Sequence, residues 1–170
     1  MLMAELTEKM IQESQGNLHD INHFLKVYAY ARTIGLQEGL SQRNQTVVEA
    51  AALVHDIACP LCRKKYGNTN GKYQEREGMP LAEAFFQGTG MPPELAERVV
   101  YLVGHHHTPE GVDGPDYQIL LEADYLVNAD ESHYTKEMIR LAGENLFRTQ
   151  TGRRLLHAIY LGGEPETAAR

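Results

Sequence analysis

Residues 47–58 read VVEAAALVHDIA, and this stretch decides the fold. Valine and alanine occupy most positions before His55, so the pattern predicts a helix that is buried on most of its sides. Pro60 follows shortly afterwards and prevents the helix from continuing. Asp56 lies at the buried end, where a carboxylate is costly unless a partner or a cation balances its charge. The stretch therefore predicts a helical core with an ionisable pair at its inner end.

The rest of the chain repeats the helical spacing. Apolar residues recur with a period of about 3.6, and no run alternates strictly for long enough to indicate a sheet. An all-α fold is therefore expected, with helices near residues 4–15, 17–35, 42–58, 80–87, 94–106, 117–128, 136–149 and 153–161. Residues 1–161 are expected to form a single helical domain, and residues 162–170 a frayed tail.

Residues 59–76 contain Pro60, Gly67 and Gly71 and are predicted to form a long loop. A connection of this length is unusual and indicates a lid or a binding segment. The loop also holds basic residues, which would either steer an anion toward a nearby site or form a solvated surface: Arg63, Lys64, Lys65 and Lys72. Its two cysteines, in the sequence CPLC, do not make a zinc knuckle, because no second pair is near.

Composition limits the classes of function. The 170 residues carry 16 Lys and Arg against 23 Asp and Glu, which gives a formal net charge of -7. Such a surface repels polyanions, so long nucleic acid and anionic membranes are not expected as partners. The opening MLMAELTEKMIQESQG mixes acids with apolar residues, unlike a signal peptide, and the apolar runs are shorter than the roughly 20 residues of a spanning helix. Two cysteines fit a reducing compartment, so the cytoplasm is expected.

Several polar residues lie on faces where the helical spacing otherwise places apolar ones. His23 lies in HFLKVYAYA, Asp124 lies in ILLEADYLV, and His106 continues the inward stripe of its helix. Taken singly, each has an ordinary explanation: a satisfied core histidine, an ion pair, or an imidazole that complements a helix dipole. Together with His55 and Asp56, they bring imidazoles and carboxylates from four helices into one core. This mixed nitrogen and oxygen set suits a divalent transition metal such as Mn, Fe, Ni or Zn.

These residues resemble the pattern of the HD domain superfamily of metal-dependent phosphohydrolases. That pattern has a His, then a His-Asp pair, then an Asp on successive helices of an all-α core. HFLKVYAYARTIG resembles the family's first-histidine helix, and Lys26 matches a basic residue often found three positions after the histidine. AALVHDIA resembles the signature helix end, and LLEADYLVN resembles the helix with the last aspartate. The resemblance covers residues 18–130 and implies a single-domain HD-type helical bundle with a buried metal site.

Residue by residue, the resemblance implies metal ligands at His23, His55, Asp56 and Asp124. The chain holds another His-Asp pair that begins at His19. It precedes an apolar helix instead of ending one, so it is interpreted as the entry to that helix and not as a ligand pair.

One divalent ion is expected to be tightly held, with a second ion possible. In two-metal relatives, Asp56 would bridge the ions, and His105 or His106 fits the second site. Where such relatives place a histidine before the fourth helix, this chain offers Glu75 or Glu77 instead. The histidine cluster would then serve substrate phosphate or a weaker second metal site.

The implied reaction is hydrolysis of a phosphate ester or anhydride in a small nucleotide-like metabolite. Asp56 is expected to orient the nucleophile, and His106 to protonate the leaving oxygen. Lys26, Lys64 and His105 are expected to bind the substrate. Two other functions stay open: a non-catalytic HD module that binds metal or nucleotide in signalling, and a di-iron HD oxygenase.

Overall fold

Five of the described helices begin where a side chain caps the first turn. Asn17 accepts the backbone N–H groups of His19 and Asp20, and other helices start at matching caps: Ser41, Asn70, Thr135 and Thr149. The computed structural model describes residues 2–162, which contain helices and no strand. The helices are α1 Leu2–Glu13, α2 Leu18–Gln37, α3 Gln42–Val54, α4 Cys59–Tyr66, α5 Gly71–Phe86, α6 Pro93–Val103, the 3₁₀ turn η1 Pro109–Gly111, α7 Pro115–Glu131, α8 Lys136–Asn145 and α9 Gln150–Tyr160. The predicted all-α fold is confirmed; of the predicted tail, only Gly162 lies within the described residues.

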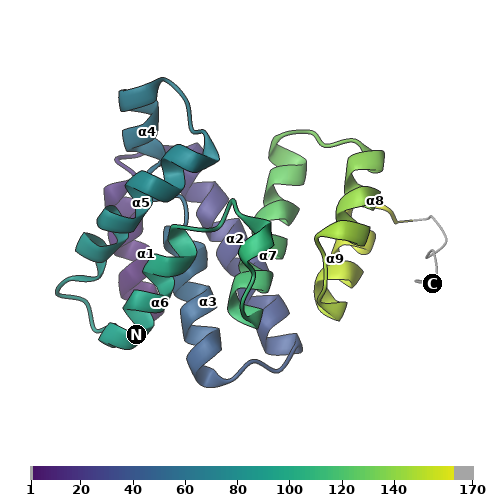
Figure 1. Cartoon of the computed structure of the whole chain (residues 1–170), viewed down its shortest axis with the longest axis horizontal. Coiled ribbons are helices and arrows are strands. Elements are labelled where there is room, and N and C mark those ends of the chain that lie inside the picture. Colours follow the sequence, from purple (N-terminus) through teal and green to yellow (C-terminus); the bar gives the residue numbers. More distant parts are fainter. Residues whose placement is uncertain (1, 163–170) are drawn as a thin grey trace.

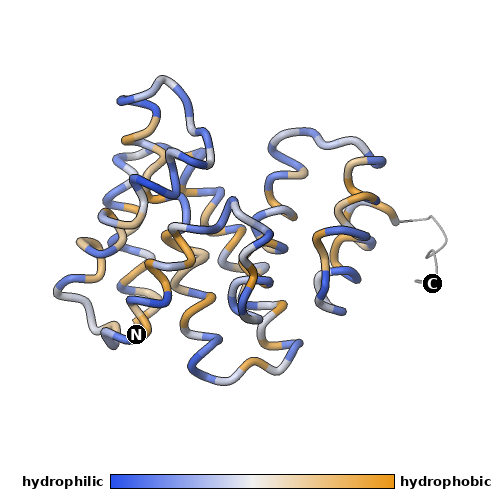
Figure 2. The backbone as a smooth tube through the Cα atoms, in the orientation of Figure 1, coloured by the Kyte–Doolittle hydropathy of each residue, from blue (hydrophilic) through white to orange (hydrophobic). Residues whose placement is uncertain are grey.

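Helices α2, α3 and α7 form the centre of the molecule. α2 packs against α3 and α7, and α3 packs in turn against α1 and α6. Figure 1 shows α4 and α5 on one side of this centre and the α8–α9 hairpin on the other. Hydrophobic residues follow the central helices in Figure 2, whereas the outer end of α4 is hydrophilic. Fully buried side chains come from several helices: Phe24, Leu53, Leu102, Ile119 and Leu120. None of the helices in residues 2–162 combines the length and apolar character that crossing a membrane requires.

The predicted loop at residues 59–76 is wrong, because most of it is helical. Pro60 lies in the first turn of α4, where its missing N–H has no intrahelical partner to lose. Gly67 then ends α4 in the left-handed conformation, with φ 70°. Asn70 caps α5, which continues through Pro80 and therefore starts nine residues earlier than predicted, at Gly71. The residues interpreted as loop signals are thus helix boundaries, and the true connection is only the short segment 67–70.

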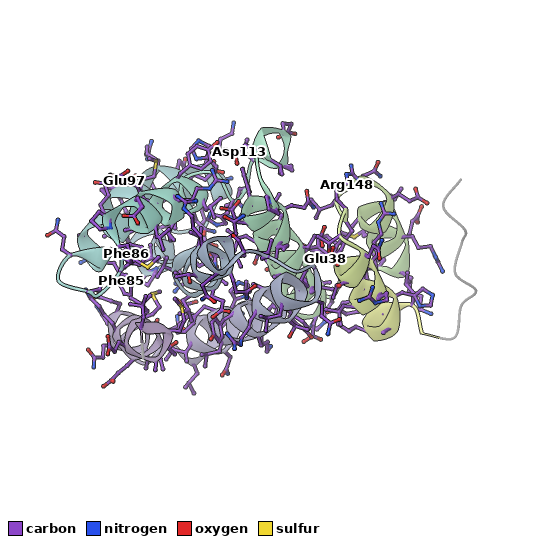
Figure 3. The ribbon with its side chains drawn as sticks, turned by 90° about the horizontal axis from the view of Figure 1, so that it is seen from below. Glu38, Phe85, Phe86, Glu97, Asp113 and Arg148 are labelled. Carbon is purple, nitrogen blue, oxygen red and sulfur yellow. The ribbon has the colours of Figure 1, made fainter. Side chains whose placement is uncertain are left out.

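A buried carboxylate holds the α8–α9 hairpin against α7. The Glu122 side chain is 0% exposed. Its Oε1 accepts the backbone N–H groups of Arg148 at 2.7 Å and Thr149 at 2.9 Å, and its Oε2 accepts the Thr149 hydroxyl. Glu38 at the end of α2 accepts the N–H of Thr151 at 2.8 Å, and Figure 3 shows Glu38 and Arg148 beside the hairpin. Two carboxylates therefore anchor the start of α9.

Replacing Glu122 with alanine is expected to lower the free energy of unfolding by roughly 3 kcal/mol, because the change leaves buried N–H groups without acceptors. Denaturant unfolding followed by circular dichroism measures the loss. Glu137→Ala removes an exposed carboxylate from α8 and should change stability by less than about 0.5 kcal/mol. Equal stabilities for the two variants would contradict the anchoring role of Glu122.

Candidate metal centre

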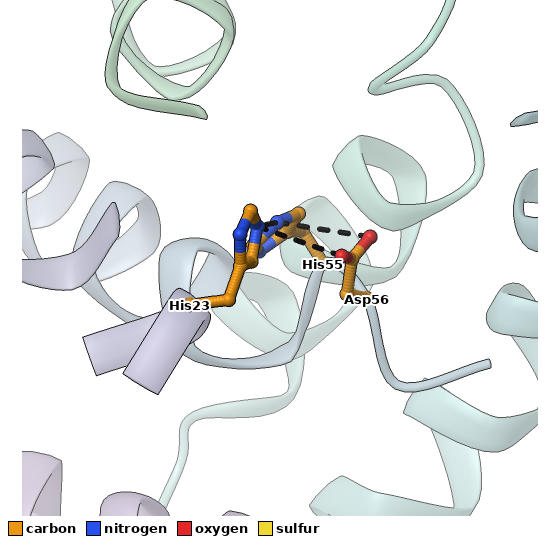
Figure 4. Close-up of side chains that lie close together, drawn as sticks. All are labelled: His23, His55 and Asp56. Carbon is orange, nitrogen blue, oxygen red and sulfur yellow. Dashed lines mark hydrogen bonds and ion pairs between the residues drawn. The ribbon is translucent and has the colours of Figure 1, made fainter. Parts of the chain in front are cut away.

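Three central helices bring four predicted ligands together. His23 comes from α2, His55 and Asp56 follow the end of α3, and Asp124 comes from α7. His23 Nε2 lies 3.2 Å from His55 Nε2 and 3.2 Å from Asp124 Oδ1. It also lies 3.5 Å from Asp56 Oδ2, and Figure 4 shows His23, His55 and Asp56 pointing toward one another. The ligand set expected from the sequence is therefore assembled around one point.

The backbone fixes which nitrogen of each buried histidine faces that point. His55 follows the last turn of α3, and its Nδ1 lies 3.0 Å from the Ala52 carbonyl oxygen. His106 follows α6 in the same way, with Nδ1 2.8 Å from the Val103 carbonyl oxygen. A carbonyl can only accept, so Nδ1 carries the proton when the ring is neutral and Nε2 keeps a free lone pair. Both Nε2 atoms thus face the cluster as potential ligands.

A second group of ligand atoms shares Asp56. His106 Nε2 lies 3.4 Å from Asp56 Oδ1, yet it is buried and makes no hydrogen bond within residues 2–162. The ligand atoms of Asp56, His106 and His107 all lie within 4.8 Å of one another, as do those of His23, His55 and Asp56. A buried imidazole nitrogen without a partner is costly, and a cation beside Asp56 would satisfy it. The donor set therefore fits one divalent ion at the first group and a second ion at the second group.

Contacts of α5 place His107 at this position. Its ring lies so close to Gly71 that a Cβ on that glycine would approach the ring Cγ to 2.7 Å. Glu75 Oε1 accepts the backbone N–H of His107 at 3.0 Å and the Thr108 hydroxyl at 2.9 Å. Glu75 was one of the two carboxylates considered for the second ion, and it instead supports the turn that carries His107.

The charges in the cluster depend on one another. Burial lowers the pKa of His23, but Asp124 and Asp56 outweigh this effect and raise the pKa to about 9. Burial raises the pKa values of Asp56 and Asp124, but the neighbouring imidazoles outweigh it and hold both values below the usual range. Without a cation, the carboxylates therefore keep their charge beside a protonated His23. A divalent cation would supply the same positive charge and displace that proton.

The stability of the metal-free protein should therefore fall at alkaline pH. The pKa of His23 is about 9 in the folded protein, against an ordinary value of 6.5. The protonated ring therefore contributes fully to the free energy of unfolding below pH 6.5, and this contribution is lost as the pH rises through 9. We expect the melting temperature of metal-free protein to decrease across this window more steeply than that of His23→Gln. Melting curves at stepped pH check this expectation. Melting temperatures that fall equally with pH in the two proteins would contradict it.

Glu131 is a site residue that sequence reasoning missed. Its Oε2 accepts a hydrogen bond from His23 Nδ1 at 2.8 Å, and its Oε1 accepts one from Lys26 at 3.1 Å. Burial raises the pKa of Glu131, but His23 and Lys26 outweigh this effect and lower it. Glu131 follows Asp124 by seven residues and so lies on the same face of α7, a spacing that could have indicated it. The carboxylate orients His23 so that Nε2 faces the cluster.

Neutralising the Glu131 carboxylate, which orients His23, should weaken metal binding. Glu131→Gln is expected to lower the affinity for Mn²⁺ by roughly 10–100-fold, because such supporting carboxylates typically contribute that much. Competition with a fluorescent chelator measures the affinity. Asp130→Asn changes the exposed neighbouring carboxylate on α7 and serves as the control. Similar affinities for the two variants would show that Glu131 does not support the ligand.

Other predicted residues lie outside the cluster. Lys26 pairs with Glu131 at the surface, and Lys64 is exposed on α4. The His105 ring stacks on Tyr101, with ring centroids 4.2 Å apart. None of these three predicted substrate-binding residues lines the cavity described below.

His19 and Glu77 are likewise not part of the cluster. The His19 side chain is 71% exposed and lies at the cavity wall, 3.7 Å from Glu131. Glu77 accepts hydrogen bonds from Tyr66 at 2.6 Å and Lys65 at 3.1 Å, where α5 meets the end of α4. The interpretation of His19 as a helix entry agrees with its position at the start of α2.

A cavity of about 500 Å³ opens above the cluster. His23, Asp56, His106 and Asp124 line its floor, and Arg63 on α4 lines its wall. Arg63 hydrogen-bonds to Asp20, also in the wall. A small molecule with an anionic group could therefore reach both the ligand cluster and a guanidinium group.

Comparisons with known proteins agree with this geometry. The family model described as HD domain matches residues 20–145. A crystal structure of a predicted HD superfamily hydrolase from an uncultured Thermotogales bacterium superposes with a TM-score of 0.68, at 22% sequence identity over 93% of this chain and 84% of that chain. That likeness shows a shared fold. No protein of curated function matches the chain.

Proposed function

The chain belongs to the HD domain family, and from this premise we propose that it is a metal-dependent phosphohydrolase acting on a phosphate ester or anhydride of a small nucleotide-like metabolite. One observation carries the proposal: the convergence of His23, His55, Asp56 and Asp124, with the buried His106 Nε2 beside Asp56 and without a hydrogen bond in the described part of the chain. Hydrolases of this kind need buried carboxylates that stay ionised and imidazoles that stay neutral, and this cluster supplies both once a cation replaces the proton on His23.

His23, His55, Asp56 and Asp124 would hold the first ion, and Asp56, His106 and His107 a weaker second one. A bound divalent cation lowers the pKa of a water ligand and polarises a phosphoryl oxygen. The Asp56 carboxylate contributes to both groups, so it would hold the ions and orient the attacking water.

His106 has two roles that exclude each other. When only the first group is filled, His106 Nε2 can hold a proton beside Asp56 and deliver it to the leaving oxygen. Burial lowers the pKa of His106, but Asp56 outweighs this effect and raises it, which favours that protonated form. When the second group is filled, the same nitrogen is a ligand, and the leaving oxygen must take its proton from solvent.

The cavity determines what kind of substrate can enter. Its volume of about 500 Å³ suits a small metabolite, and the net charge of -7 disfavours a long polyanion. Arg63 is placed to bind the phosphoryl group from the wall. Both cysteines are free thiols, which supports a reducing cytoplasm as the compartment of the reaction.

Phosphate release tests the proposal. Metal-free protein reloaded with Mn²⁺ is incubated with nucleoside mono-, di- and triphosphates, cyclic nucleotides and p-nitrophenyl phosphate, with Asp56→Asn as the control. Metal-dependent release that the control lacks would support a phosphohydrolase. Binding of nucleotide without turnover would favour the signalling module, and oxygen consumption by the Fe-loaded protein would favour the oxygenase.

A further inference from the structure

The two sides of the cavity differ in chemistry. Polar groups from α4, α5 and the connection between them line one side: Arg63, Thr69 and Gln74. The side formed by α7 and the α8 region carries the polar residues Asn128, Glu131 and Ser132 and, beside them, an aromatic and apolar group. We call these four residues the ring wall: Leu121, Tyr125, Tyr134 and Leu146. The ligand cluster lies on the floor between the two sides, so a substrate bound there touches both.

The ring wall starts directly beside a ligand. Tyr125 follows Asp124 in α7, and Leu121 precedes Asp124 by three residues, which places both within one helical turn of that carboxylate. The rings of Tyr125 and Tyr134 lie 5.5 Å apart at an interplanar angle of 52°. Both rings line the same cavity as the ligand cluster.

Other contacts hold the wall in place before any substrate binds. The Tyr125 hydroxyl donates to the Met138 carbonyl oxygen at 3.2 Å, and its ring packs edge-on against Phe147 at 5.6 Å. The backbone N–H of Tyr134 donates to the Ala129 carbonyl oxygen at 2.9 Å, which positions the backbone that carries its ring. A preorganised side chain such as that of Tyr125 contributes more to affinity, because less rotamer entropy is lost on binding.

The charges in the cavity limit the number of phosphoryl groups. Arg63 is the one Arg or Lys that lines the cavity among residues 2–162, against four carboxylates: Asp20, Asp56, Asp124 and Glu131. Asp20 already pairs with Arg63, and Glu131 pairs with Lys26. One divalent ion cancels the charges of Asp56 and Asp124, and a second ion adds two positive charges. That surplus matches one phosphoryl group, with a charge of about -2, and not a triphosphate.

On the basis of the proposed function, we propose that the ring wall binds an aromatic or heteroaromatic ring in the leaving group of a phosphate monoester. Tyr125 and Tyr134 contact the ring, and Leu121 and Leu146 pack against its edge. A nucleobase is one ring of this class. The ring wall would thus make the enzyme selective for the alcohol part of its substrate, while the cluster and Arg63 bind the phosphoryl group.

Three phosphonates test this inference without turnover. Titration calorimetry compares methylphosphonate, benzylphosphonate and cyclohexylmethylphosphonate on Mn²⁺-loaded protein. Benzylphosphonate is expected to bind about 10-fold more tightly than methylphosphonate, and more tightly than the cyclohexylmethyl compound, since aromatic stacking adds to apolar burial. Equal affinities for benzyl and cyclohexylmethyl groups, or no binding of any of the three, would overturn the inference.

Substitutions of Tyr134 test whether the ring wall causes the preference for benzylphosphonate. Tyr134→Ala should reduce the preference for benzylphosphonate to within about 2-fold of methylphosphonate, whereas Tyr134→Phe keeps the ring and should keep the preference. Tyr73→Ala is the matched control, because Tyr73 stacks on Tyr66 away from the cavity. Metal content confirms that each variant retains the cluster. A preference that survives in Tyr134→Ala would overturn the inference, whereas failure of the proposed function would show as absent hydrolysis with the binding preference intact.

Discussion

Asp124→Ala is expected to abolish tight metal binding and phosphate release while leaving the protein helical. Asp124 Oδ1 lies within 3.5 Å of both His23 Nε2 and His55 Nε2, so its removal takes the central oxygen from the first ligand group. Supporting carboxylates alone typically contribute roughly 10–100-fold to metal affinity, and a direct ligand should exceed that. Elemental analysis and phosphate release on the same preparation measure both losses.

His19→Ala is the matched control for that variant. His19 lies on α2 four residues before His23, but it is exposed and outside the ligand cluster. It should retain both metal and turnover. If His19→Ala lost its metal while His23→Ala kept it, the assignment of the first ligand on α2 would be wrong.

The second large effect concerns His107. Protein equilibrated with excess Mn²⁺ is expected to bind two equivalents, and His107→Ala only one, because the second group then keeps only Asp56 and His106. The first ion should be unaffected, since none of its ligands changes. Equilibrium dialysis with metal analysis gives the stoichiometry.

Glu77→Ala tests whether Glu77, which the family pattern suggests, binds the second ion in place of His107. Tyr66 and Lys65 at the end of α4 donate hydrogen bonds to Glu77, so its removal should leave both equivalents in place. Loss of the second equivalent in Glu77→Ala, with two equivalents retained in His107→Ala, would reverse the assignment.

The all-α fold could be predicted because apolar spacing is a local property. VVEAAALVHDIA indicates a helix buried on most sides, and α3 is indeed surrounded by α1, α2, α6 and α7. The segment after it could not be interpreted in the same way. Pro60 and Gly67 are consistent with both a loop and a short helix, because proline suits a first turn and glycine suits a helix end. Only the packing of α4 against α5 decides between these two structures.

The first ligand group could be predicted because each member interrupts an apolar face. Of the second group, Asp56 and His106 are also expected from the sequence, but His107 is not, because His105, His106 and His107 are adjacent and the turn after α6 decides where each points. His105 lies against Tyr101, His106 faces Asp56, and His107 is positioned by contacts from α5. Those contacts come from a segment that the sequence pattern had indicated as a loop.

Titrating Mn²⁺ into metal-free protein while following phosphate release tests the account most directly. The rate should be absent without metal and rise as the first equivalent binds. Asp56→Asn, which loses the carboxylate shared by both groups, should stay inactive throughout. Phosphate release by the metal-free protein, or none from the full substrate panel at saturating Mn²⁺, would contradict a metal-dependent phosphohydrolase.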